Sequence, residues 1–208
     1  MNPRGAAAVS GGTLPPLPMP DRPVNANPAA MRTRALEEFP VFAAQAAELL
    51  AAPNNTIPFL VDDALRLVPY LRLVEANTGT KLLVEGDRSH IGHLLLILEG
   101  SVSVDIADGG ELVELAVLGA GQILGELALL DGQPRSASCT AVSTVRAAGL
   151  SRVGLQRLVA EQPAVAAKFL AALAQRTGER LRGLGDQLKM YSQLVQNQQQ
   201  TISRLQER

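Results

Sequence analysis

The chain has 208 residues, 47% of them hydrophobic, and a formal net charge of −1. This length suffices for one domain with a sizeable core and excludes two large domains, while the charge argues against a protein that coats polyanions. The single cysteine, Cys139, excludes an internal disulfide framework and a cysteine-rich zinc site. The densest apolar run, residues 94–98, is too short to span a bilayer, and no signal peptide is recognisable. We therefore expect a soluble, cytoplasmic protein.

The first 70 residues divide into two segments of different composition. Residues 1–30 hold seven of the thirteen prolines together with Gly, Ala and Asn, which predicts a disordered tail or a docking peptide for a partner. From residue 31 to about 52 the apolar spacing is that of helices, with Pro40 dividing the stretch or starting its second helix. A short amphipathic helix is expected over 60–68. We thus predict N-terminal helices within 31–70.

Residues 71–151 have the periodicity of strands. One run alternates apolar with polar residues, and a second follows after the turn at 108–110; the apolar members are Val102, Val104 and Ile106, then Val113, Leu115 and Val117. Each run predicts a half-buried strand. Turn signals recur every 8–12 residues, as in a small barrel or double sheet. The predicted fold class is α+β: a small β-roll (a double-stranded β-helix or jelly-roll barrel) between N-terminal helices and a long C-terminal coiled-coil helix.

The last segment, 152–208, is predicted to be a short helix followed by a long one. Mostly apolar residues of the long helix repeat in alternating steps of four and three, with two polar residues at d: the a positions are Ala174, Leu181, Leu188, Val195 and Ile202, and the d positions are Leu170, Thr177, Leu184, Tyr191, Gln198 and Leu205. So narrow a seam favours a parallel homodimeric coiled coil over a helix folded back on its own domain. The expected contacts are Leu181, Leu184, Leu188, Tyr191, Val195, Ile202 and Leu205.

The segment 125–137, with the sequence GELALLDGQPRSA, carries the candidate chemistry. Gly125 permits a tight turn, Arg135 supplies a planar fork for phosphate oxygens, and Ser136 adds a hydroxyl. The carboxylate of Glu126 would repel the same anion, so its natural partner is a nearby hydroxyl such as a ribose 2′-OH. This combination predicts a nucleotide with a compact phosphate. The alternative is a mutual ion pair of Glu126 with Arg135.

This segment resembles the phosphate-binding cassette of the cyclic-nucleotide-binding domain, found in bacterial catabolite activator proteins and in regulatory subunits of cAMP-dependent protein kinase. Other landmarks match in order: Gly79, then residues 85–87, 98–100 and 118–121. The resemblance implies that Glu126 accepts from the ribose 2′-OH and that Arg135 binds the cyclic phosphate. It also implies a phosphate cradle made by Gly125, Leu127, Ala128, Ser136 and Ala137. The nucleotide base is implied to contact Thr177, Arg180 and Leu181 on the long helix.

The implied function is a sensor of cAMP, or less favourably cGMP, that is not an enzyme and needs no metal or other cofactor. No DNA-binding helices are recognisable after the long helix, so we expect an unknown protein effector and no direct binding to DNA or membranes. The alternatives are a regulator with a separate DNA-binding subunit, and a coiled-coil scaffold whose pocket is empty or binds a cyclic dinucleotide. His90 and His93 have poor spacing for a metal site. Cys139 is expected to be a small buried hydrophobe.

Overall fold

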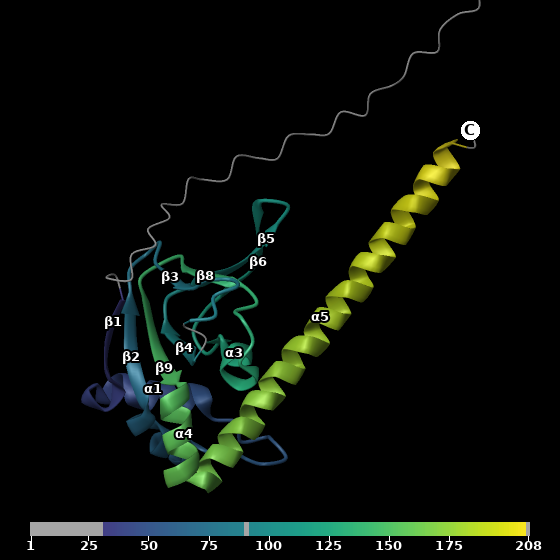
Figure 1. The fold of residues 1–208 in the computed structure, drawn as a ribbon. Coiled ribbons are helices and arrows are strands. Elements are labelled where there is room, and N and C mark those ends of the chain that lie inside the picture. The colour runs from purple at the N-terminus through teal and green to yellow at the C-terminus, as the bar shows by residue number, and fades with distance from the viewer. Residues whose placement is uncertain (1–30, 90–91, 207–208) are drawn as a thin grey trace, which may run out of the picture.

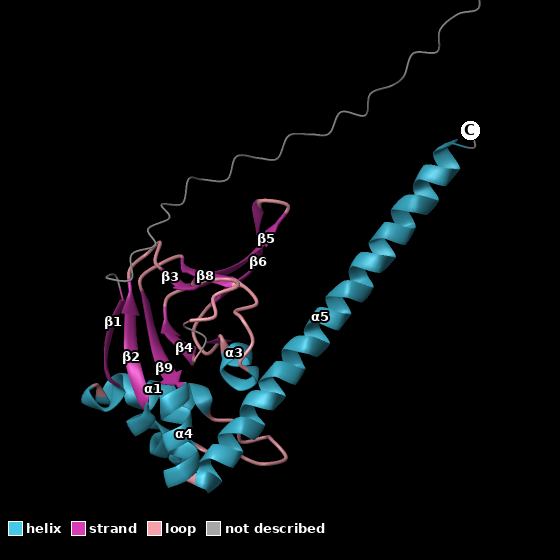
Figure 2. Ribbon diagram, viewed as in Figure 1, coloured by secondary structure: helices cyan, strands magenta, loops and turns pink. Residues whose placement is uncertain are grey.

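The computed structural model describes residues 31–89 and 92–206. Two antiparallel sheets face one another, and helices gather at one end (Figures 1 and 2). The five-stranded sheet has the order β1-β2-β9-β4-β7, with β1 Met31–Ala35, β2 Leu71–Ala76, β9 Val145–Ser151, β4 His93–Glu99 and β7 Ile123–Leu124. The four-stranded sheet has the order β3-β8-β5-β6, with β3 Lys81–Leu83, β8 Ser138–Ala141, β5 Val102–Asp108 and β6 Glu111–Leu118. This is the jelly-roll-like, β-rich fold expected from the turn rhythm.

The helices are α1 Pro40–Leu50, α2 Val61–Leu67, α3 Glu126–Asp131, α4 Arg152–Glu161 and α5 Pro163–Gln206. Among the described residues, none of these helices is both long enough and apolar enough to cross a membrane. The predicted tail 1–30 and His90 lie outside the described residues. The side chain of Leu205 lies outside them as well.

Alternate residues of strand β4 belong to two different clusters of buried hydrophobic side chains. Leu94, Leu96 and Leu98 belong to a cluster with α1, α2, α4 and α5, whereas Leu95 and Ile97 belong to the cluster between the two sheets. Because neighbouring side chains of a strand point to opposite faces, a sheet covered on both sides needs an uninterrupted apolar strand. The run 94–98 is therefore a central strand.

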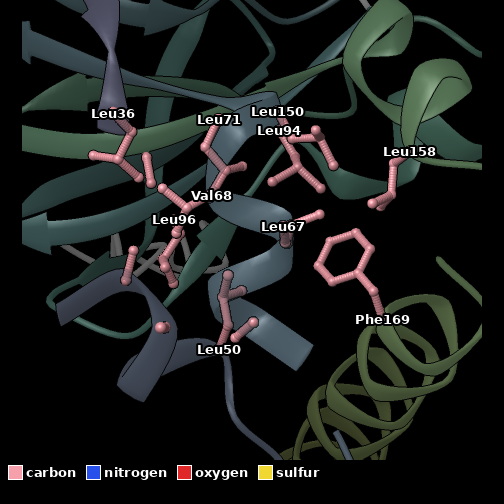
Figure 3. Packing of buried hydrophobic residues seen from close by; sticks show 14 of the residues in the cluster. Leu36, Leu50, Leu67, Val68, Leu71, Leu94, Leu96, Leu150, Leu158 and Phe169 are labelled. Atoms are coloured by element: carbon pink, nitrogen blue, oxygen red, sulfur yellow. The ribbon is translucent and has the colours of Figure 1, made fainter. Parts of the chain in front are cut away.

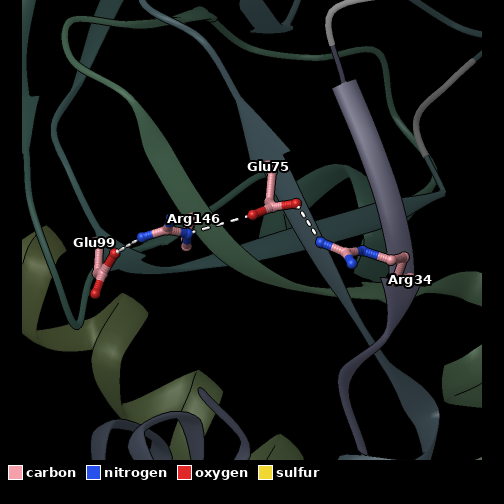
Figure 4. Close-up of polar contacts among 4 residues, drawn as sticks. All are labelled: Arg34, Glu75, Glu99 and Arg146. Atoms are coloured by element: carbon pink, nitrogen blue, oxygen red, sulfur yellow. Dashed lines mark hydrogen bonds and ion pairs between the residues drawn. The ribbon is translucent and has the colours of Figure 1, made fainter. Parts of the chain in front are cut away.

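The first expected helix differs from the structure. Met31–Ala35 is strand β1, which pairs antiparallel with residues 72–76 of β2, and α1 begins only at Pro40, a residue favoured in the first turn of a helix. Pairing with β2 supplies the backbone hydrogen bonds, and Arg34 adds an ion pair to Glu75 at 2.8 Å. Figure 4 shows this contact continuing through Arg146 to Glu99, across β9 and β4. A partner strand distant in sequence overrides the local helical spacing.

The two alternating runs form the β5–β6 hairpin, but their burial differs from the prediction. On β5 the polar residues Ser103 and Asp105 are buried, and the Ser103 hydroxyl donates to the Asp105 carboxylate over 3.0 Å. On β6 the apolar residues stay exposed, Leu112 by 62% and Leu115 by 56%. The reason is that β6 is the edge of its sheet, and its outer part has no layer packed on it.

The root of α5 is anchored in the helical core. Phe169 packs on Phe59, with ring centroids 5.9 Å apart, and in Figure 3 it points from α5 toward Leu67. Lys168 pairs with Asp63 of α2 at 2.9 Å. From Leu181 to residue 200 every α5 side chain is exposed. The helix therefore consists of a docked root and a protruding distal half whose side chains are exposed from residue 181 to residue 200.

Candidate functional site

The site is built around the short helix α3 and the glycine that precedes it. Gly125 has φ 74°, a left-handed conformation that L side chains rarely adopt. A Cβ added there would lie 2.4 Å from Nη1 of Arg135 and 3.2 Å from the carbonyl oxygen of His93. Glycine is thus required here both by the backbone turn and by the close approach of the arginine.

Arg135 is a buried charge, only 4% exposed, held by backbone oxygens of two elements. Its Nη1 donates to the carbonyl of Gly125 and its Nη2 to the carbonyl of His93, each over 2.8 Å. Nη2 also lies 3.3 Å from Nδ1 of His93. Burial lowers the pKa of the Arg135 guanidinium, while the negative charges of Asp87 and Glu126 oppose that shift. The loop before β8 is thereby tied to β4 and to the start of α3.

Glu126 is also buried, and its ion-pair partner comes from α5. Oε1 of Glu126 lies 3.1 Å from Nη1 of Arg180, whose Nη2 donates to the carbonyl of Ile123 over 3.1 Å. The sequence alternative of an ion pair with Arg135 is thus replaced by one with Arg180. A carboxylate at the start of the cassette is linked directly to the long helix.

A cleft of about 970 Å³ separates the four-stranded sheet and α3 from α5. Five of the predicted site residues line it: Glu126, Ser136, Ala137, Thr177 and Arg180. Such a volume falls in the range of small-molecule sites. Arg135 stands behind the lining, bonded to Gly125, and the hydroxyl of Thr177 donates back to the carbonyl of Leu173 over 3.0 Å.

Leu181 does not line the cleft with its neighbours Thr177 and Arg180. Its side chain is 70% exposed on the helix surface. Successive residues of an α-helix are rotated by about 100°, so the residue after Arg180 points away from the face that meets the sheet. Gly125, Leu127 and Ala128 contribute the turn and the backbone of α3 rather than cleft-lining side chains.

Three contributors were not found from the sequence. His93 supplies a carbonyl to Arg135, and Arg176 donates from α5 to the carbonyls of Gly121 and Leu49. Asn55 lines the far end of the cleft, and its buried Nδ2 has no hydrogen-bond partner among the described residues. The contacts of backbone carbonyls and of a single amide side chain in a loop leave no pattern in the sequence. Only the tertiary structure therefore shows which of these groups lie at the site.

The histidines predicted to be poor metal ligands are only partly described. His93 lies at the start of β4 beside Arg135. Over 31–89 and 92–206, no group of three or more His, Cys, Asp or Glu side chains is arranged to hold a metal ion. Cys139 is buried in the cluster between the sheets, where burial raises the pKa of its thiol to about 12.

Known proteins resemble this chain in both sequence and fold. The family model for the cyclic nucleotide-binding domain matches residues 73–162. A solved cyclic nucleotide-binding domain from Methylobacillus flagellatus is 31% identical, with a TM-score of 0.69, and the match covers 76% of this chain and 88% of that one.

Two curated bacterial relatives extend the comparison. The CRP-like cAMP-activated global transcriptional regulator of Mycobacterium tuberculosis is 30% identical over 122 residues, which is 58% of this chain and 53% of that protein. The cyclic AMP receptor protein of Thermus thermophilus is 35% identical over 102 residues, or 49% of this chain and 46% of that protein. The matches therefore span about half the length of these curated relatives. The chain belongs to the cyclic nucleotide-binding domain family.

Proposed function

We propose that the cleft between the cassette and α5 binds a 3′,5′-cyclic purine nucleotide, with cAMP preferred to cGMP. The observation that carries the proposal is the convergence of Glu126, Ser136 and Arg180 on one cleft, with the Arg135 guanidinium held behind the same loop. Two relatives named for cAMP, from M. tuberculosis and T. thermophilus, support that choice of nucleotide.

The proposed roles follow from the chemistry of each group. Glu126 is an acceptor, so it takes the ribose 2′-OH, while Arg135 and Ser136 donate to the cyclic phosphate. The backbone N–H groups of Leu127 and Ala128 add to the phosphate cradle, which Gly125 and Ala137 flank. The cleft-facing side of α5, with Thr177 and Arg180, meets the base. Leu181 belongs to the dimer seam instead.

The proposed output is a movement of α5. In this proposal the ribose hydroxyl competes with Arg180 for Glu126, whose buried carboxylate already accepts from Arg180 over 3.1 Å. A nucleotide that takes over Glu126 weakens one of the contacts that hold α5 near α3. Since a ligand shifts an equilibrium by its differential affinity for two arrangements, this competition couples binding to the position of the helix.

The distal half of α5 is proposed to form a parallel homodimeric coiled coil. Leu181, Leu184, Leu188, Tyr191, Val195 and Ile202 are all more than half exposed in the single chain. An isolated helix with Gly183 and Gly185 is marginal, since each glycine costs about 1 kcal/mol relative to alanine. A second copy that covers the seam removes this apolar exposure. Light scattering should therefore give twice the chain mass.

We further propose that the sensor is cytoplasmic, is not an enzyme and signals through a protein effector. Changes at the dimer seam or its ends would alter what docks there. A pull-down from native cytoplasm with and without cAMP tests this output. A nucleotide-dependent partner supports the effector, and the same partners in both conditions support a constitutive scaffold. A nucleotide-dependent DNA-binding subunit among the captured proteins supports a transcriptional regulator.

Calorimetry tests the ligand directly. We expect cAMP to bind with measurable heat, cGMP to bind more weakly, and AMP, which has an opened phosphate ring, to bind poorly. The recovered cAMP should be unchanged after incubation with Mg²⁺ or Mn²⁺. Absence of heat and of any shift in melting temperature with both cyclic nucleotides overturns the proposal, and a cyclic dinucleotide is then the next probe.

A further inference from the structure

The cleft extends well beyond the residues proposed to bind the nucleotide. It follows α5 from Ala172 to Gln187, which corresponds to about 22 Å of helix. Thr177 and Arg180, the α5 residues proposed to meet the base, lie near the middle of this length. Toward the root of α5 the wall of the cleft is formed by residues 51–55, in the loop that joins α1 to α2. We call this part of the cleft the loop end.

The loop end is held in place by backbone pairing and by a buried aromatic contact. Ala52 and Phe59 form an antiparallel bridge with N···O distances of 2.7 and 3.2 Å, and the Asn55 N–H donates to the carbonyl of Ala52 over 3.4 Å. Phe59 is fully buried and packs on Phe169 of α5. The contacts that bring Asn55 to the wall of the cleft therefore also anchor the root of α5.

The side chain of Asn55 has a donor that the described part of the chain does not use. Asn55 lines the cleft and is only 9% exposed, and its buried Nδ2 has no hydrogen-bond partner among residues 31–89 and 92–206. A buried donor that makes no hydrogen bond costs stability, because its contact with water is lost without replacement. The χ2 torsion of asparagine is broad, so the amide can turn toward an acceptor in the cleft.

Arg176 brings a positive charge to the same end of the cleft. Its Nη1 donates to the carbonyl of Gly121 over 3.2 Å and its Nη2 to the carbonyl of Leu49, at the end of α1, over 2.5 Å. A guanidinium has five N–H donors, so these two contacts leave others for a further acceptor. Burial lowers the pKa of Arg176, and the attraction of Glu179 opposes that shift. No ion pair between described residues includes Arg176.

The donor set of the loop end fits an oxyanion. A neutral acceptor could bond the Asn55 amide but would leave the charge of Arg176 without a counterion. A carboxylate or a phosphate offers acceptor oxygens to both groups, and charge-assisted hydrogen bonds of this kind are short and strong. Glu179 is the acidic residue of α5 nearest to Arg176 in sequence, but it is exposed and its carboxylate accepts from Gln175 over 2.8 Å.

We propose that the loop end of the cleft is a second binding site, in which Asn55 Nδ2 and the Arg176 guanidinium hold a small oxyanion, a carboxylate or a phosphate, separate from the cyclic nucleotide. The bound anion joins the loop between α1 and α2 to α5, four residues before Arg180. The inference goes beyond the proposed function and does not depend on it, because Glu126 and Arg135 take no part in holding this anion.

The melting temperature of the full chain in phosphate tests the site. Phosphate is titrated at constant ionic strength, with chloride as the balancing anion. We expect the melting temperature to rise with phosphate concentration, because a ligand that binds only the folded state stabilises it. The rise should persist in Arg135→Ala, whose cassette has lost its arginine. Acetate replaces phosphate in a parallel titration, and the anion that acts at the lower concentration identifies the class of ligand.

Two variants with matched controls assign the effect to the proposed donors. Asn55→Leu keeps the approximate size of the side chain but removes the donor, so it should weaken phosphate binding by about tenfold or more, and Arg176→Gln should do the same. The controls are Asn54→Leu, an exposed residue of the same loop, and Arg182→Gln, an exposed arginine of the same helix. Both controls should respond to phosphate as the natural sequence does.

Asn55→Leu also distinguishes a binding role from a structural one. Without phosphate this variant should melt at or above the temperature of the natural sequence, since an unsatisfied buried donor has been removed. A lower melting temperature would show that the amide is bonded within the chain and would overturn the inference. Equal phosphate responses of Asn55→Leu and Asn54→Leu would overturn it as well.

The remaining outcomes separate the second site from the cassette. A phosphate response that is lost in Arg135→Ala but kept in Asn55→Leu places the anion in the cassette and overturns the second site. Calorimetry with cAMP on the natural sequence reports the cassette independently. Binding of cAMP without any phosphate response contradicts only the second site, whereas a phosphate response without cAMP binding supports the second site and contradicts only the proposed nucleotide.

Discussion

Glu126 and Arg180 are 54 residues apart in the chain, yet their side chains form an ion pair of 3.1 Å that joins the cassette to the long helix. Glu126 is buried and Arg180 is partly exposed, so one end of the contact is fixed and the other is free to leave into solvent. In the proposed complex the same carboxylate binds the ligand and holds α5, so it is suited to couple the two.

The first prediction concerns Arg180→Gln. If Arg180 and the ribose compete for Glu126, the variant binds cAMP about two- to fivefold more tightly, because a partly exposed ion pair contributes roughly 0.2–1 kcal/mol. Calorimetry measures the change. The 2′-deoxy analogue of cAMP is the control, since it lacks the competing hydroxyl and its affinity should not rise. Weaker cAMP binding would instead mean that the contact of Arg180 with the base contributes more to affinity than its competition for Glu126 costs.

The second prediction is that Arg135→Ala weakens cAMP binding by about tenfold to a hundredfold or more, since each charge-assisted contact contributes roughly 1.5–3 kcal/mol. Arg135→Lys should restore little, because an ammonium group cannot reproduce the fork that reaches the carbonyls of both Gly125 and His93. Arg157→Ala, on the exposed face of α4, is the matched control and should bind normally. Unchanged affinity of Arg135→Ala would remove the arginine from the site.

The third prediction compares two glycines at the ends of α3. Gly125 and Gly132 have φ of 74° and 72°, so alanine strains the backbone about equally at both. Only at Gly125 does the added Cβ collide with Arg135, at 2.4 Å; at Gly132 the nearest atom is 3.6 Å away. Gly125→Ala should therefore abolish detectable cAMP binding, while Gly132→Ala should lower only the melting temperature. Similar affinities would contradict the proposed placement of Arg135.

The fourth prediction concerns acid stability of the α5 root. Burial raises the pKa of Asp63, but hydrogen bonds from Lys168 and the Leu60 N–H outweigh it and leave that pKa below the ordinary value of 3.8. The stabilisation is present above the unfolded pKa and is lost as the pH falls through the lower folded one. Asp63→Asn should thus cost up to about 1 kcal/mol at pH 7 and less near pH 3, measured by chemical unfolding. A cost that does not change with pH would show that the ion pair contributes nothing.

The fifth prediction concerns the Cys139 thiol. Burial raises its pKa to about 12, so at pH 8 almost no reactive thiolate is present in the folded protein. A thiol reagent should leave Cys139 unlabelled in the native protein. After denaturant is added, labelling should follow the rate at which the protein unfolds and exposes the thiol. Rapid labelling of the native protein would indicate that the cluster between the sheets opens readily.

Much of the fold and part of the candidate site could be predicted from short stretches of sequence. The cassette at 125–137 combines a required glycine, an arginine and a serine within thirteen positions, so its backbone turn is encoded locally. The strand periodicity of 71–151 and the heptads of α5 are likewise properties of short windows, and the β-rich fold and the long helix follow from them. The apolar run 94–98 predicts a buried segment. That its side chains are buried on both faces of a sheet depends on the layers packed around it.

Only the tertiary structure decided which distant groups meet. Local spacing at 31–35 favours a helix, but β2 offers a complete set of backbone partners and makes it a strand. Between the pairs Val104–Ala116 and Asp105–Glu114, strand β6 carries one extra residue, Leu115, so no alternation rule anticipates that Val113 and Val117 face opposite ways. Glu126 meets Arg180 rather than Arg135 because α5 is docked through Phe169 and Lys168, contacts made by residues that carry no nucleotide motif. Short windows specify local backbone geometry, whereas long-range pairing depends on packing energy summed over the whole core.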